Sequence, residues 1–247
     1  MAKSSGLGDN CYVDGNDLSG DIGSLGTIGS PLALLDVTAI NKSAHERIGG
    51  RRDGKLEFTA FWNSTGEHPV LSTLPTSDRI CSYLRGTGIG SPIASMVAKQ
   101  IDYPWNRSAD GALTAKVEAL ANGYGLEWGV QLTAGIRTDT ATTNGASWTN
   151  PAGALAFGAQ AYLHVFGFTG TDATVKLQDS ADNVTFTDIA GAAFTQITAA
   201  PGAQRLALAN TATVRQYVRA VTVTTGGFTS LAFAVQITVN PIAGVVF

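Results

Sequence analysis

Apolar and polar residues alternate along several segments of this chain, as they do in β-strands that bury one face. Residues 55–62 place leucine, phenylalanine, alanine and tryptophan at every second position, with lysine, glutamate and threonine between them. Residues 113–121 repeat this pattern, and residues 126–132 alternate again. The three segments therefore predict a sheet with one buried face and one wetted face.

A long hairpin is expected within this sheet. Residues 95–103 and 113–121 flank a polar turn that contains Asp110-Gly111, a pair that favours tight hairpin turns. The alternation predicts a polar face on the hairpin and on the strand that follows it. The residues expected on that face are Asp102, Thr114, Glu118, Glu127 and Gln131.

Two further side chains bear on this prediction. Lys116 shares the face of Glu118 and reduces the net negative charge there. Trp128 alternates with the polar residues of its strand, so we expect the indole to point into the core.

Shorter elements are expected between these strands. The apolar run 32–40 follows Pro31 and predicts a buried strand, and residues 41–48 are compatible with one or two helical turns before a Gly-Gly stop. Residues 67–77 predict a turn or short helix, and residues 78–85 predict another strand.

The ends of the chain differ in composition from its middle. Residues 1–30 are rich in glycine and polar residues and predict an arm that becomes ordered only against a partner. Residues 31–137 form a first predicted domain, and residues 138–154 lack a hydrophobic period and predict a linker. Residues 155–247 contain about seven short strand-like runs and no convincing helix, which is typical of an antiparallel β-sandwich.

Charge excludes one class of function. The 247 residues have a formal net charge of −3, and only 14% of them are charged. A protein that binds DNA through its phosphates needs clustered lysine and arginine. The densest basic cluster is Arg47, Arg51 and Arg52, which Glu46 and Asp53 interrupt. We therefore expect no sustained binding of nucleic acid.

Catalytic and metal-binding patterns are also missing from the sequence. The three histidines and two cysteines show no metal-ligand spacing, and there is no nucleophile elbow. The glycines of residues 85–92 do not match a phosphate loop, and Asp182-Asn183 is explained by a turn between strands rather than by calcium. We expect a protein that is not an enzyme and has no cofactor, metal or membrane span, made in a bacterial cytoplasm.

Two segments resemble a known family. The residues Leu177-Gln178-Asp179-Ser180, followed by Asp182, an aromatic-Thr-Asp strand and Tyr217-Val218-Arg219, are similar to the add-on domain of major tail (tail tube) proteins. These proteins occur in long non-contractile-tailed phages of actinobacteria. Glu127-Trp128-Gly129, at the end of the polar-faced hairpin, resembles the inner domain of the same family.

The resemblance implies a mainly β fold, in which a tail-tube-type β-sandwich or barrel with a long hairpin and one short helix precedes a separate β-sandwich. It also implies hexameric rings that stack into a tube and conduct DNA during ejection. The implied partners are other copies of the chain, the tape measure protein, and the tail terminator and tail-tip proteins, and DNA passes through without specific binding.

Two sets of residues receive roles from this resemblance. The polar face of the hairpin (Asp102, Thr114, Glu118, Glu127 and Gln131) would line the lumen. The arm would contact the next ring through Asp14, Asp17, Leu18 and Ile22.

Two other classes of protein remain open. One is a different virion component, such as a head decoration or distal tail protein, which needs no long polar-faced hairpin. The other is an adhesin whose β-sandwich binds carbohydrate, and a host-surface glycan is a candidate ligand of the second domain in either case. The aromatic residues that could stack on a sugar are Trp148, Phe166, Phe168 and Phe228.

Overall fold

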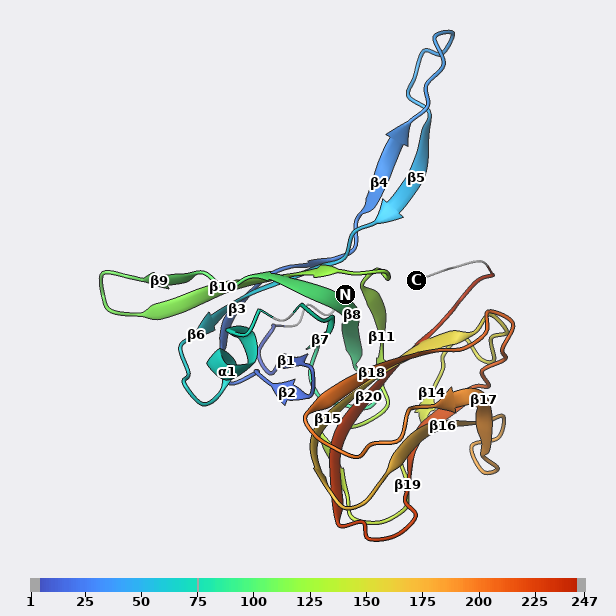
Figure 1. The fold of residues 1–247 in the computed structure, drawn as a ribbon. Helices are drawn as coiled ribbons and strands as arrows, with labels where there is room; N and C mark the ends of the chain where they lie inside the picture. Colours follow the sequence, from blue (N-terminus) through green and yellow to red (C-terminus); the bar gives the residue numbers. More distant parts are fainter. Residues whose placement is uncertain (1–4, 75, 244–247) are drawn as a thin grey trace. The chain divides into compact units, whose positions relative to one another are not determined.

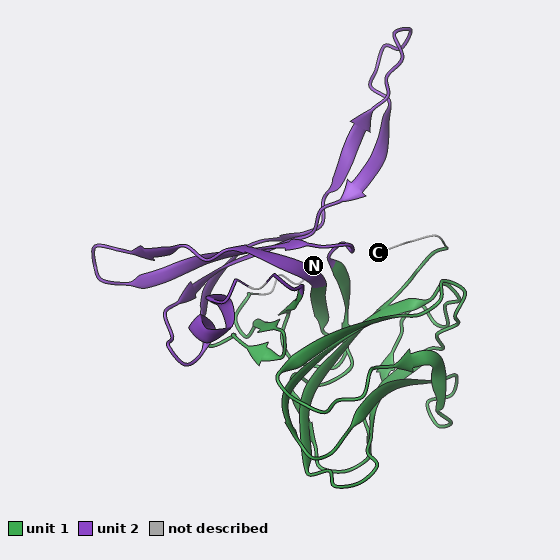
Figure 2. Ribbon diagram, in the orientation of Figure 1, with its two compact units in different colours: residues 1–20, 79–95, 127–246 green, residues 21–78, 96–126, 247 purple. Residues whose placement is uncertain are grey.

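The computed structural model describes residues 5–74 and 76–243 (Figure 1). The chain is mainly β, as predicted, and its single short helix in this part is α1 (Glu67–Leu71). It divides into two compact units (Figure 2). Unit 1 comprises residues 1–20, 79–95 and 127–246, and unit 2 comprises residues 21–78 and 96–126.

Unit 1 is a β-sandwich to which both ends of the described chain contribute. One sheet has the strand order β18-β15-β20-β11-β8, and the other has the order β13-β19-β16-β17. The principal strands are β8 (Pro92–Asp102, residues 92–95 of it in this unit), β11 (Glu127–Gln131), β15 (Ala159–Thr169), β16 (Thr174–Ser180), β17 (Thr187–Ala193), β18 (Gly202–Ala207), β19 (Tyr217–Val223) and β20 (Ser230–Val239). The shorter strands are β1 (Asn10–Val13), β2 (Asn16–Asp17), β7 (Arg79–Leu84), β12 (Arg137–Asp139), β13 (Thr143–Asn144) and β14 (Trp148–Thr149).

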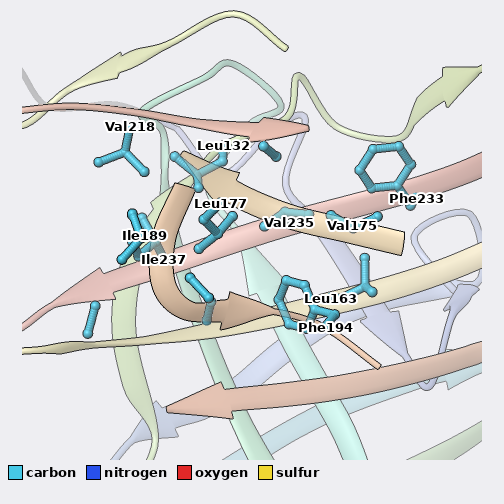
Figure 3. Packing of buried hydrophobic residues seen from close by; sticks show 14 of the residues in the cluster. Leu132, Leu163, Val175, Leu177, Ile189, Phe194, Val218, Phe233, Val235 and Ile237 are labelled. Atoms are coloured by element: carbon cyan, nitrogen blue, oxygen red, sulfur yellow. The ribbon is translucent and has the colours of Figure 1, made fainter. Parts of the chain in front are cut away.

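The core between the two sheets is apolar, as the alternating pattern requires. Leu163 on β15 and Val235 on β20 pack with Leu177 on β16 and Val218 on β19 (Figure 3). Each of these side chains is at most 2% exposed. Burial of a side chain of this size contributes about 1.5–3 kcal/mol, so each member of this cluster stabilises unit 1 substantially.

Strand β15 is buried on both faces. Its alternate residues Gln160, Tyr162 and His164 point away from the sandwich core and are at most 4% exposed. The N-terminal segment covers this second face, with the rings of Tyr12 and His164 5.8 Å apart and the backbone N–H of Gly15 donating to His164 Nδ1 at 3.1 Å.

Unit 2 is a sheet of order β8-β10-β6-β3 with a projecting hairpin. Its elements are β3 (Ile22–Gly29), β4 (Leu32–Asp36), β5 (Arg47–Arg52), β6 (Lys55–Phe61), α1, residues 96–102 of β8, β9 (Trp105–Arg107) and β10 (Leu113–Ala121). The long hairpin is confirmed, since β10 pairs antiparallel with β8 and with β9. Its turn contains Gly111 at a φ of 95°, the left-handed conformation that glycine permits.

Three expectations differ from the structure. Residues 32–40 contain a strand, but all five residues of β4 are exposed instead of buried. Residues 41–48 form no helix, because β5 begins at Arg47 and pairs with β4. Residues 138–154 contain β13 and β14, which both pair with β19, so the predicted linker belongs to the sandwich.

The predicted N-terminal arm is also more ordered than expected. Residues 10–13 form β1, which pairs with β7, and Cys11, Tyr12 and Val13 are at most 3% exposed. The chain also passes between the two units, whereas the predicted domains 31–137 and 155–247 are consecutive. That residues 155–247 form a separate domain stays a prediction.

Packing of the N-terminal segment can be tested with two glycines. Gly8 and Gly15 both have positive φ, but a Cβ at Gly8 meets nothing within 4 Å, whereas at Gly15 it would lie 2.2 Å from the carbonyl oxygen of Val165. We expect Gly8→Ala to lower the free energy of unfolding by about 1–2 kcal/mol, the cost of the left-handed backbone alone. Gly15→Ala should cost clearly more in urea unfolding, and equal losses would contradict the packing described above.

Candidate assembly surfaces

The outer face of the unit 2 sheet carries an ion-pair network. Lys55 Nζ lies 2.8 Å from Glu118 Oε1 and 3.3 Å from Glu57 Oε1, and Lys116 Nζ lies 2.9 Å from the same Glu57 oxygen. Glu57 and Glu118 are directly opposite each other on β6 and β10, so without the lysines the two carboxylates would repel. The hydrogen bond from Lys116 and those from Thr27 and Lys55 lower the pKa of Glu57 to about 2.

Three of the five predicted polar residues lie on this face. Thr114 and Glu118 are partly exposed on β10, while Ala115, Val117 and Ala119, which alternate with them, are at most 2% exposed. Asp102 is exposed and pairs across the strands with Glu118. The period-2 prediction for β10 is confirmed, and the role of this face in a lumen stays a prediction.

Glu127 and Gln131 are not on a wetted face, and that part of the prediction is wrong. Glu127 is 0% exposed and Gln131 is 1% exposed, whereas Trp128 between them is 49% exposed. The strand has the expected phase, because Val130 and, just after the strand, Leu132 pack in the sandwich core, but its polar face is buried as well.

The buried carboxylate of Glu127 is paired within unit 1. Arg205 on β18 donates from Nη2 to Glu127 Oε1 at 2.6 Å and from Nε to the hydroxyl of Tyr162 at 3.1 Å. Burial also raises the pKa of Tyr162 above its ordinary value, so the phenol stays protonated. A buried charge needs such a partner, because its desolvation is otherwise uncompensated.

Gln131 has a similar structural position. Its Nε2 donates to the carbonyl oxygen of Gly86 at 2.8 Å, and it pairs across the strands with Gln236 on β20. The amide therefore fixes the 85–92 loop to β11 and is not available to a partner molecule.

The proposed arm residues are divided between the two units. In unit 1, Asp14 accepts from Arg79 Nη1 at 2.7 Å and from the backbone N–H of Ile80 at 2.9 Å, Asp17 is exposed, and Leu18 is 1% exposed. In unit 2, Ile22 is partly buried and pairs with Ala60 on β6. Asp17 is thus the most accessible of the four, and contact with another ring stays a prediction.

A surface that the sequence analysis missed is the β4–β5 hairpin, residues 32–52, which we call the apolar hairpin. It projects from the rest of unit 2 (Figure 1). Its large apolar residues are between 46% and 108% exposed: Leu32, Leu34, Leu35, Val37, Ile40 and Ile48. A two-stranded hairpin is marginally stable in water, and a monomer rarely exposes apolar residues this densely.

Strand β3 presents a second feature relevant to assembly. One edge of β3 pairs with β6, and among the described residues no strand pairs with its other edge. An unpaired edge offers N–H and C=O groups to a strand from another chain.

A buried polar network lies on the second face of β15 in unit 1. Because Gly15 donates to Nδ1 of His164, the ring proton is on Nε2, which donates to Ser82 Oγ at 2.8 Å. Ser82 then bonds to Ser95, and Ser95 bonds to Gln236. Burial lowers the pKa of His164 to about 3, so the imidazole is neutral.

This network predicts sensitivity to acid. Below about pH 6.5 the unfolded chain protonates at position 164 and the folded chain does not, so acid favours unfolding by about 1 kcal/mol per pH unit down to about pH 3. We expect urea unfolding between pH 7 and pH 5 to show a steeper loss of stability in the native protein than in His164→Asn. The matched control His45→Asn, at an exposed histidine, should keep the native slope. Equal slopes for the native protein and His164→Asn would contradict the proposed neutral state.

Neither a metal-binding group nor a membrane-spanning helix is present among the described residues. No group of three or more histidine, cysteine or acidic side chains is arranged to bind a metal ion in residues 5–74 and 76–243. No helix in this part of the chain has the length and apolar character needed to span a bilayer.

The comparisons with known proteins are distant. No protein-family model and no curated protein matches the sequence. A solved structure of the SPP1 Dit (gp 19.1) protein, described as a paradigm of the hub adsorption apparatus in phages infecting Gram-positive bacteria, matches 94% of this chain and 99% of its own. The identity is 11% and the TM-score is 0.37.

A second match comes from the virion of a native gene transfer agent particle. It covers 50% of this chain and 98% of its own chain, at 10% identity and a TM-score of 0.42. TM-scores this low do not establish a common fold, and they assign no function to this chain.

Proposed function

We propose that this chain is a structural subunit of a phage virion, and specifically of the tail tube, in which copies assemble into stacked rings. The observation that supports this most strongly is the apolar hairpin. Its exposed leucines and isoleucines need a partner surface, and in a tube every subunit finds that surface on another copy. The motif resemblance in β11, β16 and β19 supports the same assignment.

The polar face of unit 2 fits the lumen of such a tube. Lys55 and Lys116 balance Glu57 and Glu118, and Asp102 adds one negative charge. A wall with little net charge offers DNA no row of cations that would bind phosphates by counterion release. Genomic DNA would then pass without specific binding, and the tape measure, tail terminator and tail-tip proteins would be the other partners of the tube.

The free edge of β3 supports ring closure. Edge-to-edge pairing with a strand of the neighbouring subunit would extend the sheet around the ring and remove the exposed edge. The N-terminal residues contribute differently from a free arm, because deletion of residues 1–30 would remove β1, β2 and β3 from the folded units. Substitution of exposed Asp17 is the appropriate test of an inter-ring contact.

Thiol labelling of tubes can test which face lines the lumen. The native thiols give little background, because Cys11 and Cys81 are buried and burial raises the pKa of Cys81 to about 12. We expect Glu118→Cys to react with a polymer-linked maleimide in dispersed subunits but not in intact tubes. N-ethylmaleimide should label the same residue in both.

The matched control is Val184→Cys, at an 80% exposed position of unit 1. It should react with the polymer-linked reagent in tubes and in subunits alike. Polymer labelling of Glu118→Cys in intact tubes, at the rate seen for Val184→Cys, would place the polar face outside and contradict the lumen assignment.

A further inference from the structure

A surface pocket in unit 1 lies between two tryptophans. It has a volume of about 260 Å³, and its lining includes Trp128 on β11, Trp148 on β14, and Asn150. Val130 and Ile237 contribute apolar surface to it. The sequence predicted a buried indole at Trp128, but Trp128 is half-exposed. Its position at this pocket therefore needs an explanation.

The chemistry of the lining restricts what could bind. No charged side chain lines the pocket, which disfavours phosphate, carboxylate and ammonium ligands. Two indole rings offer flat apolar surfaces with a negative face, which attract C–H groups of a ligand.

One polar side chain in the lining, that of Asn150, lacks part of its hydrogen bonding. Asn150 is 4% exposed, and its Oδ1 accepts from the backbone N–H of Ala152 at 3.1 Å. Its Nδ2 has no hydrogen-bond partner among the described residues. A buried amide donor without an acceptor costs free energy, and a ligand hydroxyl could supply the acceptor once the Asn150 side chain turns toward the pocket.

We propose that this pocket is a subsite for one pyranose ring of a neutral glycan. A pyranose has an apolar face of C–H groups and a rim of hydroxyls, which correspond to the indoles and to the Asn150 amide. The volume is below the range of about 300–1,000 Å³ typical of drug-sized ligands, and therefore suits a single ring. This inference does not depend on tube assembly.

The other aromatic residues considered for this role are engaged elsewhere in unit 1. Phe166 packs edge-on against Tyr12 with ring centroids 4.8 Å apart. Phe168 and Phe228 lie 6.3 Å apart and pack against the sandwich core. Trp148 also packs partly against this core, but among the four candidates from the sequence it is the one in the lining of the pocket, with Trp128 as its partner.

The test uses the full chain and a named panel of neutral disaccharides: maltose, lactose and N,N′-diacetylchitobiose. Binding is measured by intrinsic tryptophan fluorescence and by saturation-transfer NMR. We expect at least one sugar to give saturable binding, Trp128→Ala to weaken it about tenfold, and Trp128→Phe to restore part of the affinity. Trp128 is half-exposed and its ring lies edge-on to that of Tyr83 with the centroids 6.4 Å apart, so its replacement should leave the backbone circular dichroism spectrum unchanged.

The matched control is Trp62→Ala, at a 44% exposed tryptophan of unit 2. It should bind the same sugar with native affinity. The inference is overturned if no sugar of the panel gives saturable binding, or if Trp128→Ala binds as tightly as the native protein.

Discussion

Replacing Leu34 and Leu35 with serine is expected to abolish assembly and leave the subunit folded. The two side chains are 66% and 50% exposed on β4, so the folded subunit loses little packing when they are shortened. In the assembled state each would be covered by another copy, and burial of a leucine contributes about 1.5–3 kcal/mol. Because every subunit makes the contact, the loss recurs throughout the tube.

Sedimentation and electron microscopy of the purified variant measure this effect. The control is Val184→Ser, which removes an 80% exposed apolar side chain from a loop of unit 1. We expect tubes from the native chain and from the control, and dispersed folded subunits from the double variant. Tubes of normal length from the Leu34→Ser/Leu35→Ser chain would remove the main support for the apolar hairpin as an assembly surface.

The second large effect is expected at the buried ion pair of unit 1. Arg205→Met leaves the 0% exposed carboxylate of Glu127 without its 2.6 Å partner. Removal of one member of a buried pair costs about 3–5 kcal/mol, since the remaining charge is uncompensated. We expect a loss of this size in the free energy of unfolding measured in urea at neutral pH.

Two variants distinguish loss of the charge partner from loss of packing. Lys116→Met breaks one ion pair of Glu57 in unit 2 and should cost less than about 1 kcal/mol, because the lysine side chain is 66% exposed and Lys55 stays 3.3 Å from the carboxylate. Glu127→Gln combined with Arg205→Met should recover part of the stability that Arg205→Met loses. If Arg205→Met is no more destabilising than Lys116→Met, Glu127 is not a paired buried charge.

The local sequence was sufficient to predict buried and exposed positions in strands that have one face in water. Along β10, the polar residues Thr114, Lys116 and Glu118 alternate with buried alanine and valine, and the structure has the same arrangement. The hairpin turn at Gly111 was likewise predictable, because its left-handed backbone requires a residue type that is visible in the sequence.

The burial of the polar face of β11 was not predictable from its own residues. In its buried position Glu127 is paired with Arg205, which lies 78 positions later in the chain. Similarly, the second buried face of β15 requires Gly15 and Ser82 to approach His164 from segments 149 and 82 positions away. The local pattern predicts that a polar residue lies at the surface. Partners from distant parts of the chain allow the same residue to be buried.

The prediction of a buried strand in the apolar hairpin was wrong for the opposite reason. The run from Leu32 to Ile40 has the composition of a buried strand, but in the described chain nothing covers it. Under the proposed function the prediction of burial applies to the assembly instead of the subunit. The sequence then encodes a contact between copies, which a single chain cannot display.

Electron microscopy of the purified native chain in negative stain, over a range of concentrations, tests the central claim most directly. The account predicts hollow tubes or closed rings, with purified tail-tip complexes added as initiators where the chain alone stays dispersed. Folded single subunits at every concentration, both alone and with tail tips, would contradict the assignment of this chain as a tube subunit.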